Sequence, residues 1–422
     1  MNYQNDLAFA KAQDAQDPLK DYRNQFYIPQ VSGKDSLYFT GNSLGLQPKS
    51  ARKFVEEEMK NWETLGVEGH FADVKRPWIN YHKFSKEALA KIVGAKPIEV
   101  VTMNNLTVNL HLLMVSFYQP TKTRFKIICE AGAFPSDQYM FETQLKFHGH
   151  EPDEALIEVS PRAGENTLRT EDILNTIKTT GDELALVLIG GLQYYTGQLF
   201  DMKSITVAGH SVGAIVGFDL AHAVGNVPLQ LHDWNVDFAT WCSYKYLNSG
   251  PGNVSGVFIN ERYANDKSLN RFAGWWGHDE KERFLMKKGF IPMAGADGWQ
   301  LSNANVISTA AHLASLEIHD EAGMEALRAK SLNLTGYLEF LMNQLSGEDQ
   351  LFEILTPSNP EERGCQLSIF FHKDGRRLFE ALSAAGVIAD WREPNVIRVA
   401  PVPLYNTFED VYQFVDILRK NL

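Results

Sequence analysis

Five short apolar runs, separated by segments of helix length, constrain the fold of this chain most. They are FKIICE (125–130), LALVLI (184–189), AIVGFD (214–219), VDFATWCS (236–243) and VSGVFI (254–259). The runs are continuous rather than alternating, which is typical of strands buried on both faces by helices. The sequence therefore predicts an α/β fold with a mostly parallel central sheet.

The flanking residues predict a second, smaller unit. A helical region over about 304–345 leads into FEILTP, CQLSIFF and NVIRVA, and a last helix opens at Thr407 with Asp410 three positions on, as in a capping box. At 422 residues the chain is also too long for one core. We expect an N-terminal arm and helix (1–65) that pack with a small α+β C-terminal domain (306–422), and a large α/β domain (66–305).

Charge and cysteine content argue against several classes of protein. A net charge of −12 disfavours a nucleic-acid or anionic-membrane surface. The three scattered cysteines favour buried, reduced thiols over disulfides or a metal site. The N-terminal segment lacks the apolar core of a signal peptide, and no window approaches the roughly 18 apolar residues of a membrane span. We expect a soluble, cytoplasmic protein with no metal and no nucleic-acid or membrane partner.

Unusual polar residues follow four of the five runs. Residues 134–137 (FPSD) come just after the first run, Gly190 follows the second, Asp219 ends the third, and Tyr244 and Lys245 follow the fourth. In open parallel sheets, ligands bind beyond the carboxyl ends of the strands. These residues are therefore expected to meet at one edge of the sheet and to form a binding site there.

Lys245 and Asp219 form the pair with the clearest chemistry. A lysine at the end of an apolar run either reaches solvent or has its amine held in a pocket, where a desolvated amine loses its proton more easily and can form a Schiff base. Asp219 lies 26 positions upstream, also after an apolar run. Pyridoxal phosphate needs an amine to hold its aldehyde and an anion beside its pyridine nitrogen. The pair therefore indicates a pyridoxal phosphate site.

Other interpretations stay open for several residues. The segment 104–107 (NNLT) suits a phosphate at a helix N-terminus but is also typical of plain N-capping. Arg398, inside an apolar run, pairs either with an internal acid or with a substrate carboxylate. The loop 274–278 (GWWGH) is either an interior bend or a surface laid against a ligand or a partner subunit. A metal site is a further alternative, although its candidates match no common metal spacing: Asp219, His222, His232, Asp233 and Asp237.

The motifs of the chain, taken together, resemble those of the kynureninase family, fold-type I pyridoxal phosphate enzymes of the aspartate-aminotransferase-like superfamily. The resemblance covers nearly the full length. It rests on YFTGNSLGLQP (38–48), GHFADVKRPW (69–78), NNLTVNLHLLM (104–114), AFPSDQYM (133–140), YYTGQLF (194–200), GFDLAHAVGNVPL (217–229), WCSYKYLNSGPG (241–252), GWWGH (274–278), SNAN (302–305), RGCQLSIFF and IRVAPVPLYN. The lysine motif alone would not separate the chain from cysteine desulfurases.

The resemblance implies roles for individual residues. Lys245 would carry the cofactor, Asp219 would pair with its ring nitrogen, and Tyr244 would join the acid–base steps. Arg398 would bind the substrate α-carboxylate, while His70, Ser302 and Asn303 would surround its aryl end. Trp275 and Asn303 resemble residues that reach the pocket across a dimer interface. The further implied cofactor contacts are Leu106, Thr107, Phe134, Pro135, Ser136, Asp137, Gly190, His222, Trp275 and Asn303.

Two positions depart from the family pattern. Residue 190 is glycine where some relatives have serine, which removes any hydroxyl contact at that point. Residues 296–299 (ADGW) also differ from the expected sequence before Ser302 and Asn303, and this puts the local loop geometry in question.

The implied reaction is hydrolysis of the Cβ–Cγ bond of L-kynurenine or 3-hydroxy-L-kynurenine, giving L-alanine and anthranilate or 3-hydroxyanthranilate, in tryptophan catabolism or NAD-precursor synthesis. The implied assembly is a homodimer with shared active sites, and His70 favours the hydroxylated substrate. A desulfurase or aminotransferase on the same fold, and a non-catalytic cofactor-binding protein, are the alternatives. A desulfurase needs a reactive cysteine on a mobile loop, whereas Cys365 lies in a predicted strand.

Overall fold

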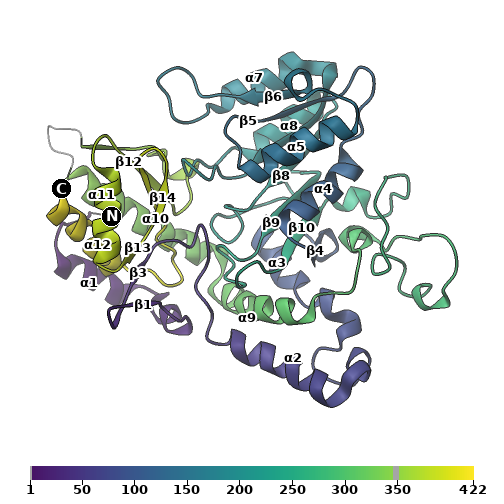
Figure 1. Ribbon diagram of the computed structural model, residues 1–422, viewed down its shortest axis with the longest axis horizontal. Helices are drawn as coiled ribbons and strands as arrows, with labels where there is room; N and C mark the ends of the chain where they lie inside the picture. Colours follow the sequence, from purple (N-terminus) through teal and green to yellow (C-terminus); the bar gives the residue numbers. More distant parts are fainter. Residues whose placement is uncertain (1, 346–350) are drawn as a thin grey trace.

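The computed structural model describes residues 2–345 and 351–422 and is built around a seven-stranded sheet (Figure 1). All five apolar runs form strands of it, which confirms that prediction: β5 (Lys126–Glu130), β7 (Leu184–Gly190), β8 (Ile215–Asp219), β9 (Phe238–Cys242) and β10 (Ser255–Ile259). Two strands that were not predicted, β4 (Val100–Met103) and β6 (Leu156–Val159), are only four residues long and lie at the two edges. The strand order is β4-β10-β9-β8-β7-β5-β6.

The sheet is mostly parallel, as expected. Strands β9, β8, β7, β5 and β6 pair in parallel, whereas β10 is antiparallel to both β9 and β4. The reason is local: the connection 243–254 contains no crossover helix, and without one the chain returns beside β9 in the opposite direction. The carboxyl ends of β4, β5, β7, β8 and β9 therefore share one edge with residues 243–254.

Helices cover both faces of this sheet, so that its strands are buried on both sides. One face packs against α4 (Leu106–Phe117) and α5 (Pro135–Phe147). The other packs against α3 (Lys86–Val93), α7 (Thr170–Thr180) and α8 (Met202–Ser211). A short helix, α6 (Pro152–Ala155), precedes β6. Successive residues of β5 enter opposite cores: Ile127 and Cys129 face α4 and α5, and Ile128 faces the other layer.

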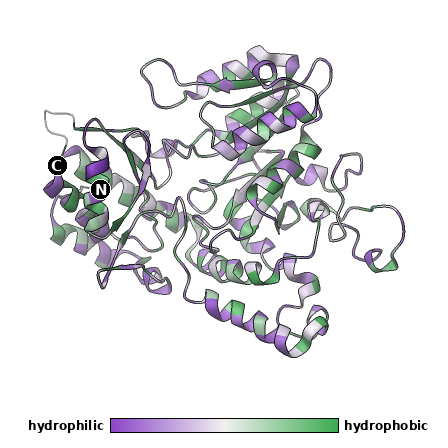
Figure 2. Ribbon diagram, viewed as in Figure 1, coloured by the Kyte–Doolittle hydropathy of each residue, from purple (hydrophilic) through white to green (hydrophobic). Residues whose placement is uncertain are grey.

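A second, four-stranded antiparallel sheet lies beside the first. Its order is β11 (Phe352–Ile354), β12 (Leu367–Phe371), β15 (Val396–Val399) and β14 (Asp390–Arg392). It shares a core with α1 (Leu7–Gln16), α10 (Met324–Asn343), α11 (Gly375–Ala384) and α12 (Phe408–Asn421). In Figure 2 the strands are mostly coloured hydrophobic, whereas outer helices such as α2 (Ala51–Leu65) carry both colours.

The expected long helical region is two helices, α9 (Val306–Ala322) and α10, because Gly323 between them adopts a left-handed φ of 75°. Helix α9 contacts α2 and the core of the large sheet. The arm packs against elements that surround the smaller sheet: α1 contacts α12, and β3 (Leu37–Tyr38) pairs with β13 (Val387–Ile388) in a separate two-stranded sheet. It also forms the hairpin β1 (Gln30–Val31) and β2 (Lys34–Asp35). The division at residues 65 and 305 stays a prediction.

The last helix begins with the predicted capping box. The Asp410 backbone N–H donates to the Thr407 hydroxyl at 3.0 Å, and the Thr407 N–H donates to the Asp410 carboxylate at 3.2 Å. Among the helices of the described residues, none has the length and apolar composition that a bilayer-spanning segment requires.

Candidate active site

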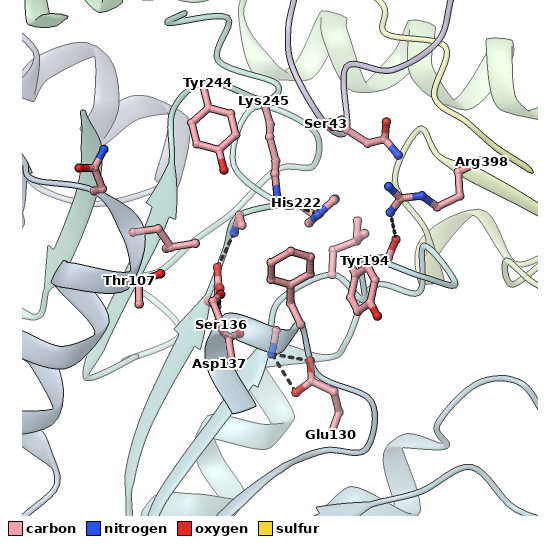
Figure 3. A pocket seen from close by; sticks show the side chains of 18 of the residues that line it. Ser43, Thr107, Glu130, Ser136, Asp137, Tyr194, His222, Tyr244, Lys245 and Arg398 are labelled. Atoms are coloured by element: carbon pink, nitrogen blue, oxygen red, sulfur yellow. Dashed lines mark hydrogen bonds between the residues drawn. The ribbon is translucent and has the colours of Figure 1, made fainter. Parts of the chain in front are cut away.

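A cavity of about 420 Å³ lies where the carboxyl ends of β5, β7, β8 and β9 approach the smaller sheet (Figure 3). Each of these strand ends contributes lining residues, and Arg398 of β15 contributes from the smaller sheet. The cavity therefore brings together most of the site residues expected from the sequence: Leu106, Thr107, Phe134, Ser136, Asp137, Gly190, Asp219, His222, Tyr244, Lys245 and Arg398. Pro135 starts α5 between two of these lining residues.

The remaining expected residues lie outside this cavity. Ser302 and Asn303 line a separate hollow of about 210 Å³, which shares Asn105 with it. Trp275 is 45% exposed on the loop before Asp279, while the adjacent Trp276 is buried. His70 ends a 3-10 helix (Gly66–His70), where its Nδ1 lies 3.0 Å from the Val67 carbonyl. One chain alone does not assemble all the residues that the sequence grouped together.

The Lys245 amine points into the cavity. Its Nζ lies 2.9 Å from His222 Nε2 and 5.9 Å from the centre of the Phe134 ring. Burial, followed by the charge of Lys245, holds the pKa of His222 well below its usual range. The imidazole is therefore neutral and can accept a hydrogen bond from the lysine. The alternative of a solvent-directed surface lysine is wrong, because the amine lines the cavity (Figure 3).

Two buried aspartates, Asp137 and Asp219, contact each other on the opposite side of the cavity. The Ala221 N–H donates to Asp219 at 2.8 Å. Burial raises the pKa of both carboxyls, and the neighbouring Asp219 carboxylate raises that of Asp137 further. Their mutual hydrogen bond favours the neutral form of Asp137 and the ionised form of Asp219. Within the pair, a proton is therefore favoured on Asp137 over Asp219.

The N-terminus of α4 borders the same cavity and has no side-chain cap. The Asn105 amide donates instead to the Gly252 carbonyl at 3.0 Å. The alternative of plain N-capping is therefore wrong for this helix. Free N–H groups in its first turn, with the exposed Thr107 hydroxyl, form an arrangement that suits an anion such as a phosphate.

Arg398 has an internal acid as a partner, and one of its N–H donors has no partner among the described residues. It is 1% exposed and lies directly opposite Asp390 on the neighbouring strand, with which it forms an ion pair. It also donates to the Tyr194 carbonyl at 2.6 Å. Its Nε, by contrast, is buried without a hydrogen-bond partner among the described residues. A buried donor of this kind indicates a place for a ligand oxygen beside the arginine.

Contacts from two segments far apart in the sequence hold the lysine segment in place. The Gly45 N–H donates to the Tyr244 carbonyl at 2.8 Å, and a Cβ on Gly45 would lie 2.3 Å from the Lys245 carbonyl oxygen. On the other side, His319 Nε2 of α9 lies 3.0 Å from the Tyr246 carbonyl. Because the two backbone segments approach so closely, position 45 requires glycine.

Several lining residues were not singled out as site residues from the sequence. Asn42, Ser43 and Tyr194 belong to motifs that carried the resemblance, so a signal for them existed. Glu130 ends a predicted strand, which was a usable signal, because the other strand ends supplied site residues. Asn105 lies in the segment 104–107 that was a phosphate candidate, and Ala221 lies in the motif 217–229. Nothing in the local sequence marked the remaining two, Leu192 and Arg392.

Burial and placement remove two of the alternatives. Cys365 is fully buried, and burial raises the pKa of its thiol to about 12, so it is not the reactive cysteine of a desulfurase. The proposed metal cluster is dispersed, because His232 contacts Glu99 and Asp237 contacts His210 and Arg262, away from Asp219. The sequence departure at 296–299 has a structural explanation: Asp297 forms an ion pair with Lys86, and Trp299 is buried.

Comparison with known proteins gives consistent relatives. Residues 327–418 match the family described as "Kynureninase C-terminal domain". The chain is 60% identical to the kynureninase of Flavobacterium psychrophilum, covering 100% of this chain and 99% of the relative, and 54% identical to that of Myxococcus xanthus, covering 99% and 97%.

Solved structures share the fold at low identity. A cysteine desulfurase from Thermococcus onnurineus NA1 superposes with a TM-score of 0.74 at 15% identity, covering 92% of this chain and 94% of that one. A C-DES mutant with glycine covalently linked to its PLP cofactor gives 0.76 at 17% identity, covering 94% and 98%. These likenesses confirm the expected fold class.

Proposed function

The chain belongs to the kynureninase family, so that cleavage of kynurenine is its reaction, and from this premise we propose how its residues carry out that reaction. The reaction is hydrolysis of the Cβ–Cγ bond of L-kynurenine or its 3-hydroxy derivative, which yields L-alanine and the corresponding anthranilate. The observation that carries the assignment of roles is the cavity lined together by Asp219 at the end of β8, Lys245 just after β9 and Arg398 within β15.

The cofactor is pyridoxal 5′-phosphate, and the cavity fits it. When bound, the cofactor supplies an aldehyde that captures an amine and a ring that accepts electrons. The Lys245 amine, the Asp219 carboxyl and the uncapped start of α4 match its aldehyde, ring nitrogen and phosphate. Phe134 would cover the ring, with Leu106, Ser136, Asp137, Gly190 and His222 completing the pocket.

Lys245 is the residue to which we assign proton transfer at the substrate Cα. When not bound to the cofactor, its amine would take the proton from the substrate Cα and hold it close to that carbon. His222, neutral and 2.9 Å away, can hold the amine in position during this exchange. Burial raises the pKa of the Tyr244 phenol, which therefore keeps its proton at neutral pH and can act as an acid during water addition and bond cleavage.

Arg398 binds the substrate α-carboxylate in this proposal. Its unpartnered Nε provides the donor, while Asp390 and the Tyr194 carbonyl hold the guanidinium in one orientation. Because Arg398 comes from the smaller sheet and Lys245 from the larger, the substrate's carboxylate and amine would be held from opposite sides (Figure 3). This arrangement orients the Cα–H bond toward the lysine.

We further propose that the active form is a cytoplasmic homodimer whose sites use both chains. Exposed apolar side chains gather on the loop that projects at the right of Figure 1 and on Phe71, which contacts Phe284 of that loop. A surface of this kind is typical of subunit interfaces. It includes Trp275, Phe284, Leu285 and Met286. Trp275 and Asn303 would then reach the partner's cavity, which explains why they lie outside their own.

The proposed roles predict that Lys245 is required for turnover and carries the cofactor. Purified protein should convert L-kynurenine to fluorescent anthranilate, and Lys245→Ala should abolish this activity. Borohydride reduction followed by peptide mapping should place the pyridoxyl label on residues 242–250. A label on another lysine would contradict the assignment.

Asp219→Asn should leave the cofactor bound but slow turnover by roughly a hundredfold or more, because a neutral amide does not stabilise a protonated ring nitrogen. The measurement is kcat at full cofactor occupancy, checked by absorbance. Gln138→Asn provides a control. Gln138 lies on the same helix as Asp137, and its exposed side-chain amide donates a hydrogen bond to Glu158, which the shorter asparagine would not reach. Near-normal kcat in Asp219→Asn would place the anion elsewhere, with Asp137 as the next candidate.

Shared sites predict complementation between inactive proteins. Lys245→Ala mixed with Trp275→Ala or Asn303→Ala should regain up to about a quarter of wild-type activity, since half of the dimers are mixed and each then contains one intact site. Each variant alone should stay inactive. If subunits exchange, as shown by differently tagged chains, and no activity returns, each chain builds its own site.

His70 predicts a preference for 3-hydroxykynurenine. Histidine and the Ser302–Asn303 pair can hydrogen-bond a ring hydroxyl, and leaving such groups unpaired lowers affinity for the plain ring. We expect a higher kcat/KM for the hydroxylated substrate, and a shift toward L-kynurenine in His70→Trp. The idea is wrong if wild type prefers L-kynurenine or if the substitution leaves the ratio unchanged.

A further inference from the structure

Glu130 is a buried acid of the cavity to which the family resemblance assigned no role. It ends β5, is 4% exposed, and lies at the bottom of the view in Figure 3. The Gly190 N–H donates to both of its carboxylate oxygens, each at 3.1 Å. A buried carboxylate that receives only backbone N–H groups and no cation is poorly compensated for its lost hydration.

The Glu130 carboxyl occupies the space that a side chain at position 190 would take. A Cβ built on Gly190 would lie 2.8 Å from Glu130 Oε1, closer than real Cβ contacts allow. Position 190 is the one at which this chain has glycine and some relatives have serine. The polar group that faces the cavity at the end of β7 is therefore supplied by β5, the neighbouring strand in the sheet.

Burial and a nearby charge both favour the neutral form of Glu130. Asp219 at the end of β8 and Asp137 on α5 are the acids of the cavity beside it, and Lys245 and His222 face them from across the space. Glu158 on β6 acts on the adjacent Cys129. Burial, and then the Asp219 charge, raise the pKa of Glu130 to about 7. Three carboxyls thus face a pocket into which a bound ring brings one positive charge.

We propose that Glu130 is a positioning residue of the cofactor pocket, which fixes the Gly190 amide and carries an exchangeable proton that is released when a cationic ring binds beside Asp219. The inference rests on the proposed function, because it takes pyridoxal phosphate as the ligand. A cation in the pocket favours the ionised carboxylate, and the proton passes to solvent. This group therefore makes cofactor binding tighter as the pH rises through the neutral range.

The test compares cofactor affinity in three apoproteins between about pH 6 and about pH 8.5. Pyridoxal 5′-phosphate is titrated into wild type, Glu130→Gln and Glu158→Gln, and Kd is measured from protein fluorescence. Glu158 is a matched control because it is exposed on the neighbouring strand, opposite Cys129. Titrations of the cofactor and of groups outside positions 130 and 158 occur in all three proteins, so they cancel in the ratio of Kd values.

The ratio of Kd for Glu130→Gln to Kd for wild type should rise about tenfold across this range, while the ratio for Glu158→Gln stays flat. Parallel curves for Glu130→Gln and wild type would overturn the proposal. The proposal would also be overturned if the pH dependence of Kd disappeared in Asp137→Asn but persisted in Glu130→Gln, because the released proton would then come from Asp137. A protein that does not bind the cofactor at all would instead contradict the proposed function.

Thermal unfolding of the apoprotein gives a second readout. The folded-state pKa of Glu130 lies above its ordinary value, so the folded state holds a proton that the unfolded state has lost, and wild type loses stability as pH rises from about 5 to about 7. Glu130→Gln lacks this loss, and its Tm should gain by a few degrees relative to wild type over that range. If Glu130→Gln does not fold, Glu130→Asp replaces it. The shorter side chain withdraws the carboxyl from its place in the cavity and should therefore shift the midpoint of the pH dependence of Kd. An unchanged midpoint would overturn the proposal.

Discussion

A carboxyl group buried at the end of β8 is the feature on which the rest of the site depends. Asp219 is 8% exposed, receives one N–H bond from Ala221, and shares a hydrogen bond with a second buried acid. Burying a carboxylate in this way is unfavourable unless a cation compensates it. Lys245 lowers the pKa of Asp219 from across the cavity, but among the described residues its amine lies within hydrogen-bond distance of His222 and forms no ion pair with Asp219. The pocket is therefore built to receive a positively charged ring.

The second requirement is that two separate sheets meet at this carboxyl group. The large sheet supplies the lysine and the acids, whereas the smaller sheet supplies Arg398, held by Asp390 directly across the strand pair. The N-terminal arm closes over the lysine segment through Gly45, and α9 supports that segment from behind through His319. Rigid support from several elements fixes the distance between an amine-binding group and a carboxylate-binding group, which positional catalysis requires.

Unfavourable backbone angles and unsatisfied polar groups are concentrated around this cavity. Asn104, before α4, and Asn248, after the lysine, both adopt left-handed backbone angles, with φ of 46° and 53°. The first turn of α4 lacks a side-chain cap, and the Arg398 Nε has no partner among the residues described. Each feature lowers stability by itself, and their concentration in one place is typical of a ligand site whose groups are satisfied only when the ligand is bound.

The sequence by itself determined the elements of the large sheet and the chemistry at their ends. Continuous apolar runs indicated strands buried on both faces, and Asp219 and Lys245 followed or ended such runs. Both features could be predicted because the apolar pattern and the order of residues are local properties of the chain. Tertiary structure alone decided the reversed direction of β10, the edge strands β4 and β6, the pairing of Arg398 with Asp390, and the position of Glu130 in the space left by Gly190. These features depend on contacts between segments far apart in sequence. Which strand pairs with which, and where two backbone segments approach closely, produces no periodic pattern in the sequence. The same reason separates Trp275, Ser302 and Asn303 from the cavity: a motif shows which residues occur together in a chain, and only the folded surface shows which of them lie outside the site.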